Sequence, residues 1–493
     1  GRGPSNGRSV ANQGIGVHLV NALNNQIGPD AAQVASSAAS RNVISGNLGS
    51  GVLVEFQSGR ETVDASTANR ISGNYIGVDA TGTTPLGNLL YGVALSNTLG
   101  TLVGSSAGTS VIAGTLAPTS AGVSNVISGN GQVNVYLTGT TSGARVLGNY
   151  IGVGADGAAY DASGAPRNLA SQQASVLIDD NARNNLIGGL PMTASEAVPG
   201  TGNIITQNWT TTPATTTVGV MVNSPFATGN QIASNVIGLD ANGRSGGNAI
   251  GVLLNNAQQT TIGGLLGGPR AGGGPYSSFG NVISGNSDSG VEITGPLAAN
   301  DRIYGNFIGT DFTGTVQPAP RVEPTTNPLF RPSQANGVLI LQGTGHVVGA
   351  ATSGSNLISG NVVGVSIAAL QSGGTAPSGN VIEGNVVGTD STGMKAVPNY
   401  EFGVLVTSSA GNLIRGNLIS ANGVAGVEIL GGQSQAGAAT SLANTITGNN
   451  IGLNAAGQVA FAVTNGSQTI SSINDHPAIT LPDGMVINYG FQS

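Results

Sequence analysis

Four aspartates in a recurring turn-like segment are the residues of this chain that come nearest to a metal site. Each opens the pattern Asp-x-Thr/Asn-Gly. A column of carboxylates at one corner could bind Ca²⁺, which prefers oxygen ligands. The same pattern is typical of a type I turn, which favours Asp at its first position and Gly at its fourth. The weak Ca²⁺ candidates are Asp79, Asp240, Asp311 and Asp390.

The turn is the favoured interpretation of these aspartates. A last copy carries Asn454 in place of Asp, and Asn suits a type I turn equally well. Successive copies lie far apart in the sequence, so we expect several structural repeats to separate neighbouring carboxylates. We therefore expect no cofactor, with Ca²⁺ as the weaker alternative.

A second acidic feature is the adjacent pair Asp179 and Asp180, followed by Arg183. Hydrolysis of a glycosidic bond needs two carboxyl groups about 5 to 9.5 Å apart. Neighbouring residues of a strand point to opposite faces, so this pair shares a site only if it lies in a turn. The pattern is weak evidence for a glycosidase.

Other catalytic arrangements find no support in the residue spacing. His18, His346 and His476 are far apart, so neither a His-ligated metal site nor a Ser-His-Asp triad is indicated. The single lysine, Lys395, lies in a turn segment with only Asp390 nearby. We predict no catalytic, cofactor-binding or metal-binding residues.

The composition excludes several kinds of partner. Only 8% of residues are charged, against roughly 25% in a typical globular chain. With a net charge of -7 and no run of Lys or Arg, a nucleic-acid partner is excluded. No apolar run approaches the roughly 20 residues that span a membrane. Cysteine is absent, which rules out disulfides and leaves the compartment open.

The elements that must position these residues repeat along the chain. Residues 69–77 read Asn-Arg-Ile-Ser-Gly-Asn-Tyr-Ile-Gly, and close copies begin at 230, 301, 380 and 444. Across the copies the second and fourth positions are mostly polar, whereas the third is nearly always Ile, Leu or Val. This alternation predicts a strand with one buried face. Gly and Asn end it, a second short strand follows, and a recurring Gly-Val block supplies a third.

The spacing of the copies predicts a solenoid. Asn-x-Ile anchors fall mostly 18 to 32 residues apart, which is too far for two-residue hairpins, and helical periodicity is missing. Successive copies are therefore predicted to stack in parallel, and parallel crossovers are right-handed in nearly all cases. About 17 anchors predict about 17 coils and a rod of roughly 80 Å, at about 4.8 Å per coil.

Contacts between coils explain why the same residues return. Each inward Ile lies on the Ile of the next coil, and each turn Asn donates an amide hydrogen bond to a neighbouring turn. A buried amide without a partner is costly, whereas stacked amides satisfy one another. The predicted structural ladder is Asn69, Ile71, Asn74, Asn230, Ile232, Asn235, Ile303, Asn306, Asn380, Ile382, Asn385, Asn444, Ile446 and Asn449.

The repeats resemble those of right-handed parallel β-helix proteins, the architecture of pectate-lyase-like enzymes and of many bacterial surface proteins. Asn-Val-Ile-Ser-Gly-Asn at 42–47 and Ile-Gly-x-Asp-x-Thr-Gly at 76–82 are similar to repeats of large secreted bacterial proteins. The resemblance covers roughly residues 10–465. It implies an all-β, single-stranded right-handed parallel β-helix with three short strands per coil. Of the motifs of polygalacturonases, only the paired aspartates are present, and the glycine-rich nonapeptide of calcium-binding β-rolls is absent.

Two regions follow from this pattern: a parallel β-helix with loop insertions over 1–465, and an extended tail or cap over 466–493. A solenoid has an unpaired strand edge at each end, which soluble proteins usually cover. The start looks uncapped, and the chain begins Gly1-Arg2-Gly3, as expected of a processed product or a piece of a longer protein. The tail 468–493 is predicted either to pair with the edge of a neighbouring copy or to cap its own last coil.

Three functions therefore remain open. The first is an extracellular or cell-surface structural protein, a subunit of a fibre, sheath or layer that assembles as a homo-oligomer or polymer through its ends or tail. The second is an adhesin that binds glycans or proteins through the inserted loops. The third is a polysaccharide lyase, hydrolase or epimerase.

Overall fold

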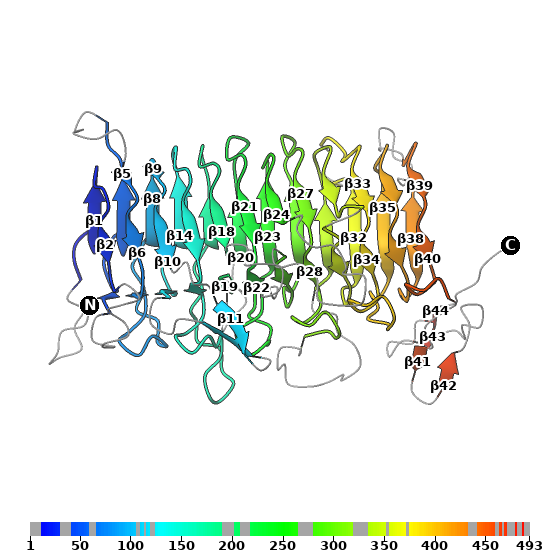
Figure 1. Cartoon of the computed structure of the whole chain (residues 1–493), viewed down its shortest axis with the longest axis horizontal. Coiled ribbons are helices and arrows are strands. Elements are labelled where there is room, and N and C mark those ends of the chain that lie inside the picture. Colours follow the sequence, from blue (N-terminus) through cyan, green and yellow to red (C-terminus); the bar gives the residue numbers. More distant parts are fainter. Residues whose placement is uncertain are drawn as a thin grey trace.

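The protein is a right-handed parallel β-helix, seen side-on in the computed structural model in Figure 1. Three parallel sheets of 12 strands each form its sides, and the chain visits sheets 1, 2 and 3 in turn. The predicted fold class, all-β with three short strands per coil, is confirmed. The structure describes residues 11–29, 41–58, 66–104, 109–112, 115–118, 124–189, 202–207, 217–264, 280–318, 334–351, 354–370, 374–431 and 441–458, and the strands at 463–465, 468–470, 479–480 and 486–487.

Sheet 1 contains the longest strands, because a run of alternating apolar residues follows each Gly-Val block. Its strands are β1 (Val17–Val20), β4 (Val52–Glu55), β8 (Tyr91–Ser96), β14 (Val133–Thr138), β17 (Ala174–Ile178), β20 (Val218–Val222), β23 (Ile250–Asn255), β26 (Ser289–Thr294), β29 (Asn336–Ile340), β32 (Val363–Ala368), β35 (Phe402–Thr407) and β38 (Ala425–Leu430).

Sheet 2 contains short strands, many of which follow an Asn-x-Ile or Asn-x-Leu anchor, and most are cut short by Gly or a polar residue. Its strands are β2 (Gln26–Ile27), β6 (Arg70–Ile71), β10 (Leu102–Gly104), β15 (Arg145–Leu147), β18 (Leu186–Gly188), β21 (Gln231–Ala233), β24 (Thr261–Gly263), β27 (Arg302–Tyr304), β30 (Val347–Val348), β33 (Val381–Glu383), β36 (Leu413–Arg415) and β39 (Thr445–Thr447).

Sheet 3 contains two-residue strands. They are β3 (Val43–Ile44), β7 (Tyr75–Ile76), β13 (Val126–Ile127), β16 (Tyr150–Ile151), β19 (Ile204–Ile205), β22 (Val236–Ile237), β25 (Val282–Ile283), β28 (Phe307–Ile308), β31 (Leu357–Ile358), β34 (Val386–Val387), β37 (Leu418–Ile419) and β40 (Asn450–Ile451).

The remaining strands pair locally, outside the three sheets. β5 (Ser66–Thr67) pairs with β9 (Thr98–Leu99) in parallel, and β11 (Thr109–Ile112) pairs with β12 (Thr115–Pro118) as a hairpin. In the C-terminal region β41 (Val463–Asn465) pairs with β42 (Gln468–Ile470), and β43 (Ile479–Thr480) with β44 (Val486–Ile487), both antiparallel. The division into a helix and a tail at residue 466 stays a prediction, because only these strands of the tail are described.

The predicted count of about 17 coils is wrong, since the described residues form 12. The cause is that the anchor occurs at two corners of one coil. In the first coil Asn25-Gln26-Ile27 leads into sheet 2, and Asn42-Val43-Ile44 leads into sheet 3. Counting every Asn-x-Ile therefore counts some coils twice. Twelve coils correspond to a rod of roughly 55 Å at about 4.8 Å per coil.

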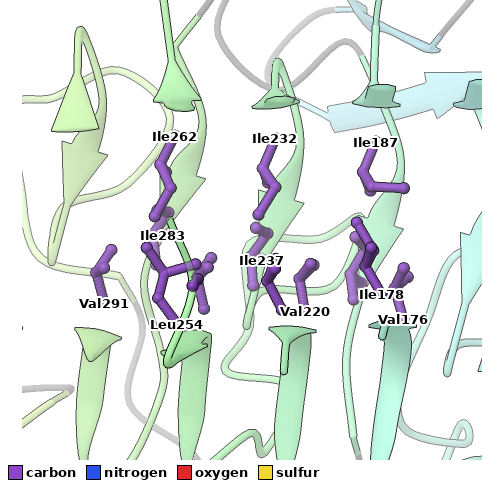
Figure 2. Close-up of a cluster of buried hydrophobic side chains, with 14 of the residues drawn as sticks. Val176, Ile178, Ile187, Val220, Ile232, Ile237, Leu254, Ile262, Ile283 and Val291 are labelled. Carbon is purple, nitrogen blue, oxygen red and sulfur yellow. The ribbon is translucent and has the colours of Figure 1, made fainter. Parts of the chain in front are cut away.

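The core is a stack of aliphatic side chains, in which an isoleucine or valine of one coil lies on an isoleucine or valine of the next. Ile71 pairs in register with Ile27 and Val103, and Ile232 pairs with Ile187 and Ile262. Figure 2 shows the buried Ile, Val and Leu of all three sheets meeting inside several successive coils. Since neighbouring coils place equivalent Cβ atoms about 4.8 Å apart, a β-branched column fills the interior without gaps.

Sheet 3 is covered on its outer face as well, which the alternating pattern did not predict. The first residue of most of its strands, such as Tyr75, Tyr150 and Phe307, points outward and is nevertheless buried. These side chains pack against residues of the turns between sheets 3 and 1, including Val153 and Leu239. A second apolar layer therefore lies outside sheet 3.

None of the described residues forms a helix long and apolar enough to cross a membrane.

Candidate functional site

The polar residues at the corner between sheets 2 and 3 form a continuous ladder of 12 asparagines, which we call ladder I. Each Nδ2 donates to the Oδ1 of the asparagine in the next coil, over 2.8 to 3.1 Å. The residues of ladder I are Asn42, Asn74, Asn125, Asn149, Asn203, Asn235, Asn281, Asn306, Asn356, Asn385, Asn417 and Asn449. Every step of the described rod is bridged at this corner.

The other two corners carry ladders that are interrupted. Ladder II, between sheets 1 and 2, is built from Asn25, Asn69, Asn185, Asn230, Asn380, Asn412 and Asn444. Ladder III, between sheets 3 and 1, is built from Asn12, Asn47, Asn88, Asn130 and Asn134, and then Asn248, Asn286, Gln334, Asn361, Asn399 and Asn422. Its members stand outside the Asn-x-Ile anchor, so sequence reasoning missed it.

The structure divides the asparagines named from the sequence between two of these corners. Asn74, Asn235, Asn306, Asn385 and Asn449 lie in ladder I, and Asn69, Asn230, Asn380 and Asn444 lie in ladder II. Of the isoleucines, Ile71, Ile232, Ile303 and Ile382 are buried, whereas Ile446 in the last described coil is 46% exposed.

Three of the four candidate aspartates lie closer together than the sequence indicated. Together with a related turn at 154–157, their turns occur on alternate coils and contact their neighbours. One coil separates the turn of Asp311 from those of Asp240 and Asp390, whereas three coils separate Asp79 from Asp240. The amide of Ala241 donates to the carbonyl of Gly157, and that of Ser391 donates to the carbonyl of Gly314, over 3.0 and 2.8 Å. The expectation that several repeats separate these aspartates is therefore wrong for Asp240, Asp311 and Asp390, and it holds for Asp79 and Asp240. We call this arrangement, with its members at 79–82, 154–157, 240–243, 311–314, 390–393 and 454–457, the turn row.

Each carboxylate in the turn row is occupied by its own turn. Asp79 Oδ1 accepts hydrogen bonds from the hydroxyl of Thr81 and from the amides of Thr81, Thr83 and Thr84. Burial pushes the pKa of Asp79 upward, but these hydrogen bonds outweigh it and the pKa lies below its ordinary value. Such bonds favour the ionised form and hold the turn closed. The carboxylate of Asp79 therefore acts as a cap of its own turn.

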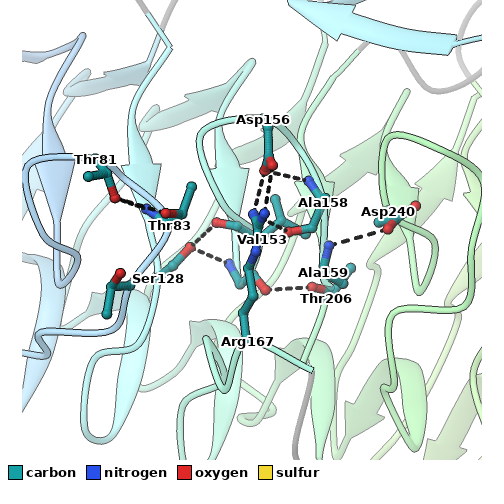
Figure 3. A network of polar contacts seen from close by, with 12 residues as sticks. Thr81, Thr83, Ser128, Val153, Asp156, Ala158, Ala159, Arg167, Thr206 and Asp240 are labelled. Atoms are coloured by element: carbon teal, nitrogen blue, oxygen red, sulfur yellow. Dashed lines mark hydrogen bonds and ion pairs between the residues drawn. The ribbon is translucent and has the colours of Figure 1, made fainter. Parts of the chain in front are cut away.

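Asp240 also links two turns. Its Oδ1 accepts from the amides of Asn242 and Arg244, while Oδ2 accepts from the amide of Ala159 in the preceding long connection (Figure 3). Burial raises its pKa in spite of these three donors. Next to it in Figure 3, Arg167 holds Asp156 through two hydrogen bonds of 2.5 and 2.7 Å. The carboxylates of this region therefore stabilise loops.

Because the carboxylates of the turn row are occupied by their own turns, we predict that Ca²⁺ does not change the melting temperature of the protein. The described residues contain no group of three or more His, Asp or Glu side chains placed to bind a metal. We expect that adding Ca²⁺ or a chelator changes the melting temperature by less than about 1 °C, where binding at 100 times Kd would stabilise by about 2.7 kcal/mol. Asp311→Asn, which copies Asn454, should melt at the wild-type temperature. A Ca²⁺-dependent rise that Asp311→Asn removes would contradict this.

The pair Asp179 and Asp180 lies in the turn that follows β17, and both carboxyls accept hydrogen bonds from nearby donors. Asp180 has a φ of 53° and its Oδ2 accepts from Thr138 and from the amide of Gly139. Asp179 accepts from the amide of Asp180 at 2.7 Å. Both carboxyls thus serve local hydrogen bonds that hold the turn.

The histidines lie in unrelated places. His18 Nε2 is 2.7 Å from Glu55 on sheet 1. His346 is fully buried at the corner of ladder II, beside Asp301. His476 lies outside the described residues. No two of the described histidines share a site.

The outer face of sheet 1 carries a carboxyl that sequence reasoning missed. Apolar side chains of β14 to β23, among them Leu177, Val218 and Ile250, cover this face, and the rings of Tyr91 and Tyr136 lie 4.8 Å apart on it. Glu292 of β26 stands in the same row, in register with Leu253 and Leu339. The signal was available, because Glu292 occupies a Gly-Val-x-Ile position that holds leucine in the coils on either side.

Glu292 is the titratable group on this face that is best suited to proton transfer. Burial, reinforced by the charge of Asp288, raises the pKa of Glu292 to about 7. A carboxyl with such a pKa exchanges its proton near neutral pH, which suits a general acid or base. In the described residues no second carboxyl faces it from a neighbouring strand of sheet 1 at the same position, since those residues are leucines.

Comparisons with known proteins do not assign this chain to a family. No family model matches the chain, and no curated protein matches it in sequence. Among solved structures it is similar to the Dettilon tailspike protein, at 12% identity and a TM-score of 0.24 over 85% of this chain and 64% of the tailspike.

Two further structures are similar to the same degree. A mannuronan C-5 epimerase A-module of Azotobacter vinelandii shares 11% identity, with a TM-score of 0.24 over 88% of this chain and 90% of the module. The surface adhesin PfbA of Streptococcus pneumoniae shares 12% identity, with a TM-score of 0.23 over 93% and 92%. The chain spans less than two thirds of the length of the tailspike. Similarity at these identities and TM-scores says nothing about activity.

Proposed function

We propose that this chain is an extracellular structural protein, a rigid β-solenoid subunit of a surface fibre, sheath or layer. The observation that supports this most directly is ladder I, which joins all 12 described coils through buried amides. The turn row and the sheets use most other polar groups in the same way. Side chains that hold one coil on the next stiffen a rod, whereas they are not available to a substrate.

Assembly through an end of the rod is supported by the last described coil. Ile446 and Ile451 are in register with the fully buried Ile414 and Ile419, yet they are 46% and 47% exposed. Among the described residues no strand follows β38, β39 and β40 in the three sheets, and an exposed apolar end of this kind is a surface that another strand or coil can cover.

Sedimentation and negative-stain microscopy of the purified chain test this proposal. We expect rods that join end to end as the concentration rises, and the double variant Ile446→Asp/Ile451→Asp should abolish the joining. Leu297→Asp is the matched control, because Leu297 is a 55% exposed residue on a turn in the middle of the rod. A chain that stays monomeric at all concentrations would contradict assembly.

A second candidate function rests on Glu292. The raised pKa of this carboxyl, on an apolar face with an aromatic pair, suits a polysaccharide lyase, hydrolase or epimerase. The structural proposal predicts no new unsaturated or reducing ends when acidic and neutral polysaccharides are incubated with the protein. Turnover that falls at least tenfold in Glu292→Gln but not in Glu428→Gln, at the equivalent position of β38, would replace the structural proposal with this one.

A further inference from the structure

One of the interruptions of ladder II, in the middle of the rod, brings two ionisable side chains together. In a regular step, both the amide and Nδ2 of Asn380 donate to Oδ1 of Asn412, each over 3.1 Å. Two consecutive coils instead carry Asp301 and His346 at this position. Both side chains are 0% exposed, so the change lies inside the corner.

Toward the coils before and after this pair, Asp301 and His346 keep the hydrogen bonds of ladder II. Oδ1 of Asp301 accepts from the amide of Thr260 over 2.8 Å, and the amide of His346 donates to Oδ1 of Asn380 over 3.1 Å. Between them, the amide of Asp301 donates to Nδ1 of His346 over 3.3 Å, and Oδ2 of Asp301 lies 3.3 Å from the same nitrogen. Oδ2 of Asp301 and Nε2 of His346 are buried without a well-directed hydrogen bond.

This arrangement requires a proton. A nitrogen that accepts from an amide presents its lone pair, and a carboxylate oxygen presents lone pairs too, so the two repel unless a proton lies between them. Without that proton the pair would be a buried negative charge. Arg302 is the adjacent cation, but it is exposed on the outer face of sheet 2, where it donates to the hydroxyl of Tyr304. Among the main causes that shift the pKa of Asp301, the titratable group is His346.

We propose that Asp301 and His346 share one proton that is taken up when these two coils pack together, so that the step between β27 and β30 is a pH-sensitive joint in the rod. With the proton on Oδ2, the carboxyl of Asp301 can donate to Nδ1 of His346, which also accepts from the amide of Asp301, and the pair is neutral. This inference concerns the stacking of coils and does not depend on assembly or on any activity.

The direction of the pH effect follows from Asp301. Burial raises the pKa of this carboxyl, although the contact with His346 and the amide of Thr260 act against that shift. In the open joint, an ordinary imidazole already holds one proton below about pH 6.5, and an ordinary carboxyl holds a second below about pH 3.9. The closed joint holds one proton for the pair, so its stabilisation is fully present between about pH 3.9 and 6.5 and is lost as the pH rises from about 6.5 through the folded-state value of Asp301. The joint should therefore open more readily at alkaline pH than in mild acid.

Hydrogen exchange of the whole chain tests the joint. The reporters are the amides of Val347 and Gly349, which donate to the carbonyls of Asp301 and Ile303 across the joint. After correction for the intrinsic exchange rate, we expect their opening to increase by up to tenfold per pH unit, the limit for one linked proton. The amides of Leu413 and Thr445, which cross regular steps of the same ladder, should show no such slope.

Three variants identify the proton site. Asp301→Asn keeps an acceptor for Thr260 and gains an amide that can donate to His346, so it should fold and lose the slope. His346→Asn leaves the buried carboxyl in place and should keep a slope. The double variant restores a regular asparagine step and should be flat, with protection equal to that of the control amides. A slope that persists in Asp301→Asn, or a wild type without a slope, would overturn the proposal.

Discussion

Replacing Asn306 by alanine is expected to lower the free energy of unfolding by about 4 kcal/mol, because several buried groups lose partners that are worth about 1 to 3 kcal/mol each. Asn306 is fully buried and occupies the middle of ladder I. Its Oδ1 accepts from both the amide and Nδ2 of Asn281, over 3.0 and 2.8 Å. Its Nδ2 donates to Oδ1 of Asn356 and to the carbonyl of Ile262, each over 3.0 Å.

Alanine at 306 would leave two donors and two acceptors facing a cavity in the low-dielectric corner. Since the coils stack in one dimension, the loss falls on the two interfaces beside this coil and weakens the rod there. Urea denaturation followed by circular dichroism measures the effect. Asn242→Ala is the control, because Asn242 is an exposed residue of the turn row. Equal stability of the two variants would show that ladder I does not stabilise the stack.

Replacing Gly309 by alanine is expected to cost about 3 kcal/mol, through backbone strain and steric overlap together. Gly309 has a φ of +92°, a conformation that residues with a Cβ rarely adopt. A Cβ at this position would lie 2.3 Å from both the carbonyl oxygen of Ser359 and Oδ1 of Asn361 in the next coil. Ordinary contacts are longer than 3.4 Å, so the next coil would have to move away.

Gly379 separates the two contributions. It also has a positive φ, of +64°, but a Cβ there would meet nothing within 4 Å. Gly379→Ala should therefore show only the strain of the backbone, about 1 kcal/mol. The difference between the two variants in urea denaturation measures the overlap between coils. If Gly309→Ala lost no more stability than Gly379→Ala, coil spacing would be more adaptable than the structure indicates.

Most of the fold could be predicted from the local repeat. A strand that buries every second residue, ends in Gly-Asn and returns beyond the reach of a hairpin has few arrangements other than a parallel stack. The inward position of Ile71 and Ile303 and the corner position of Asn74 and Asn306 follow from that alternation. These features depend on neighbours within a few residues, so one coil contains the information.

Features that depend on which coil meets which could not be predicted. The turns of Asp240 and Asp311 touch because of how the connections between them fold, and the sequence spacing of 71 positions does not reveal this. The count of coils failed for a related reason, since Asn25 and Asn42 carry the same motif at two corners of one coil. Loop insertions of unequal length hide the register between coils.

The amino-acid sequence by itself determined that this chain winds into parallel coils with aliphatic side chains inside and asparagines at the corners, because each coil must match the next. Only the tertiary structure decided which unlike residues came to face each other. It placed Glu292 among leucines and Asp301 against His346, residues separated by 45 positions, because packing across coils brings together side chains that no local spacing relates.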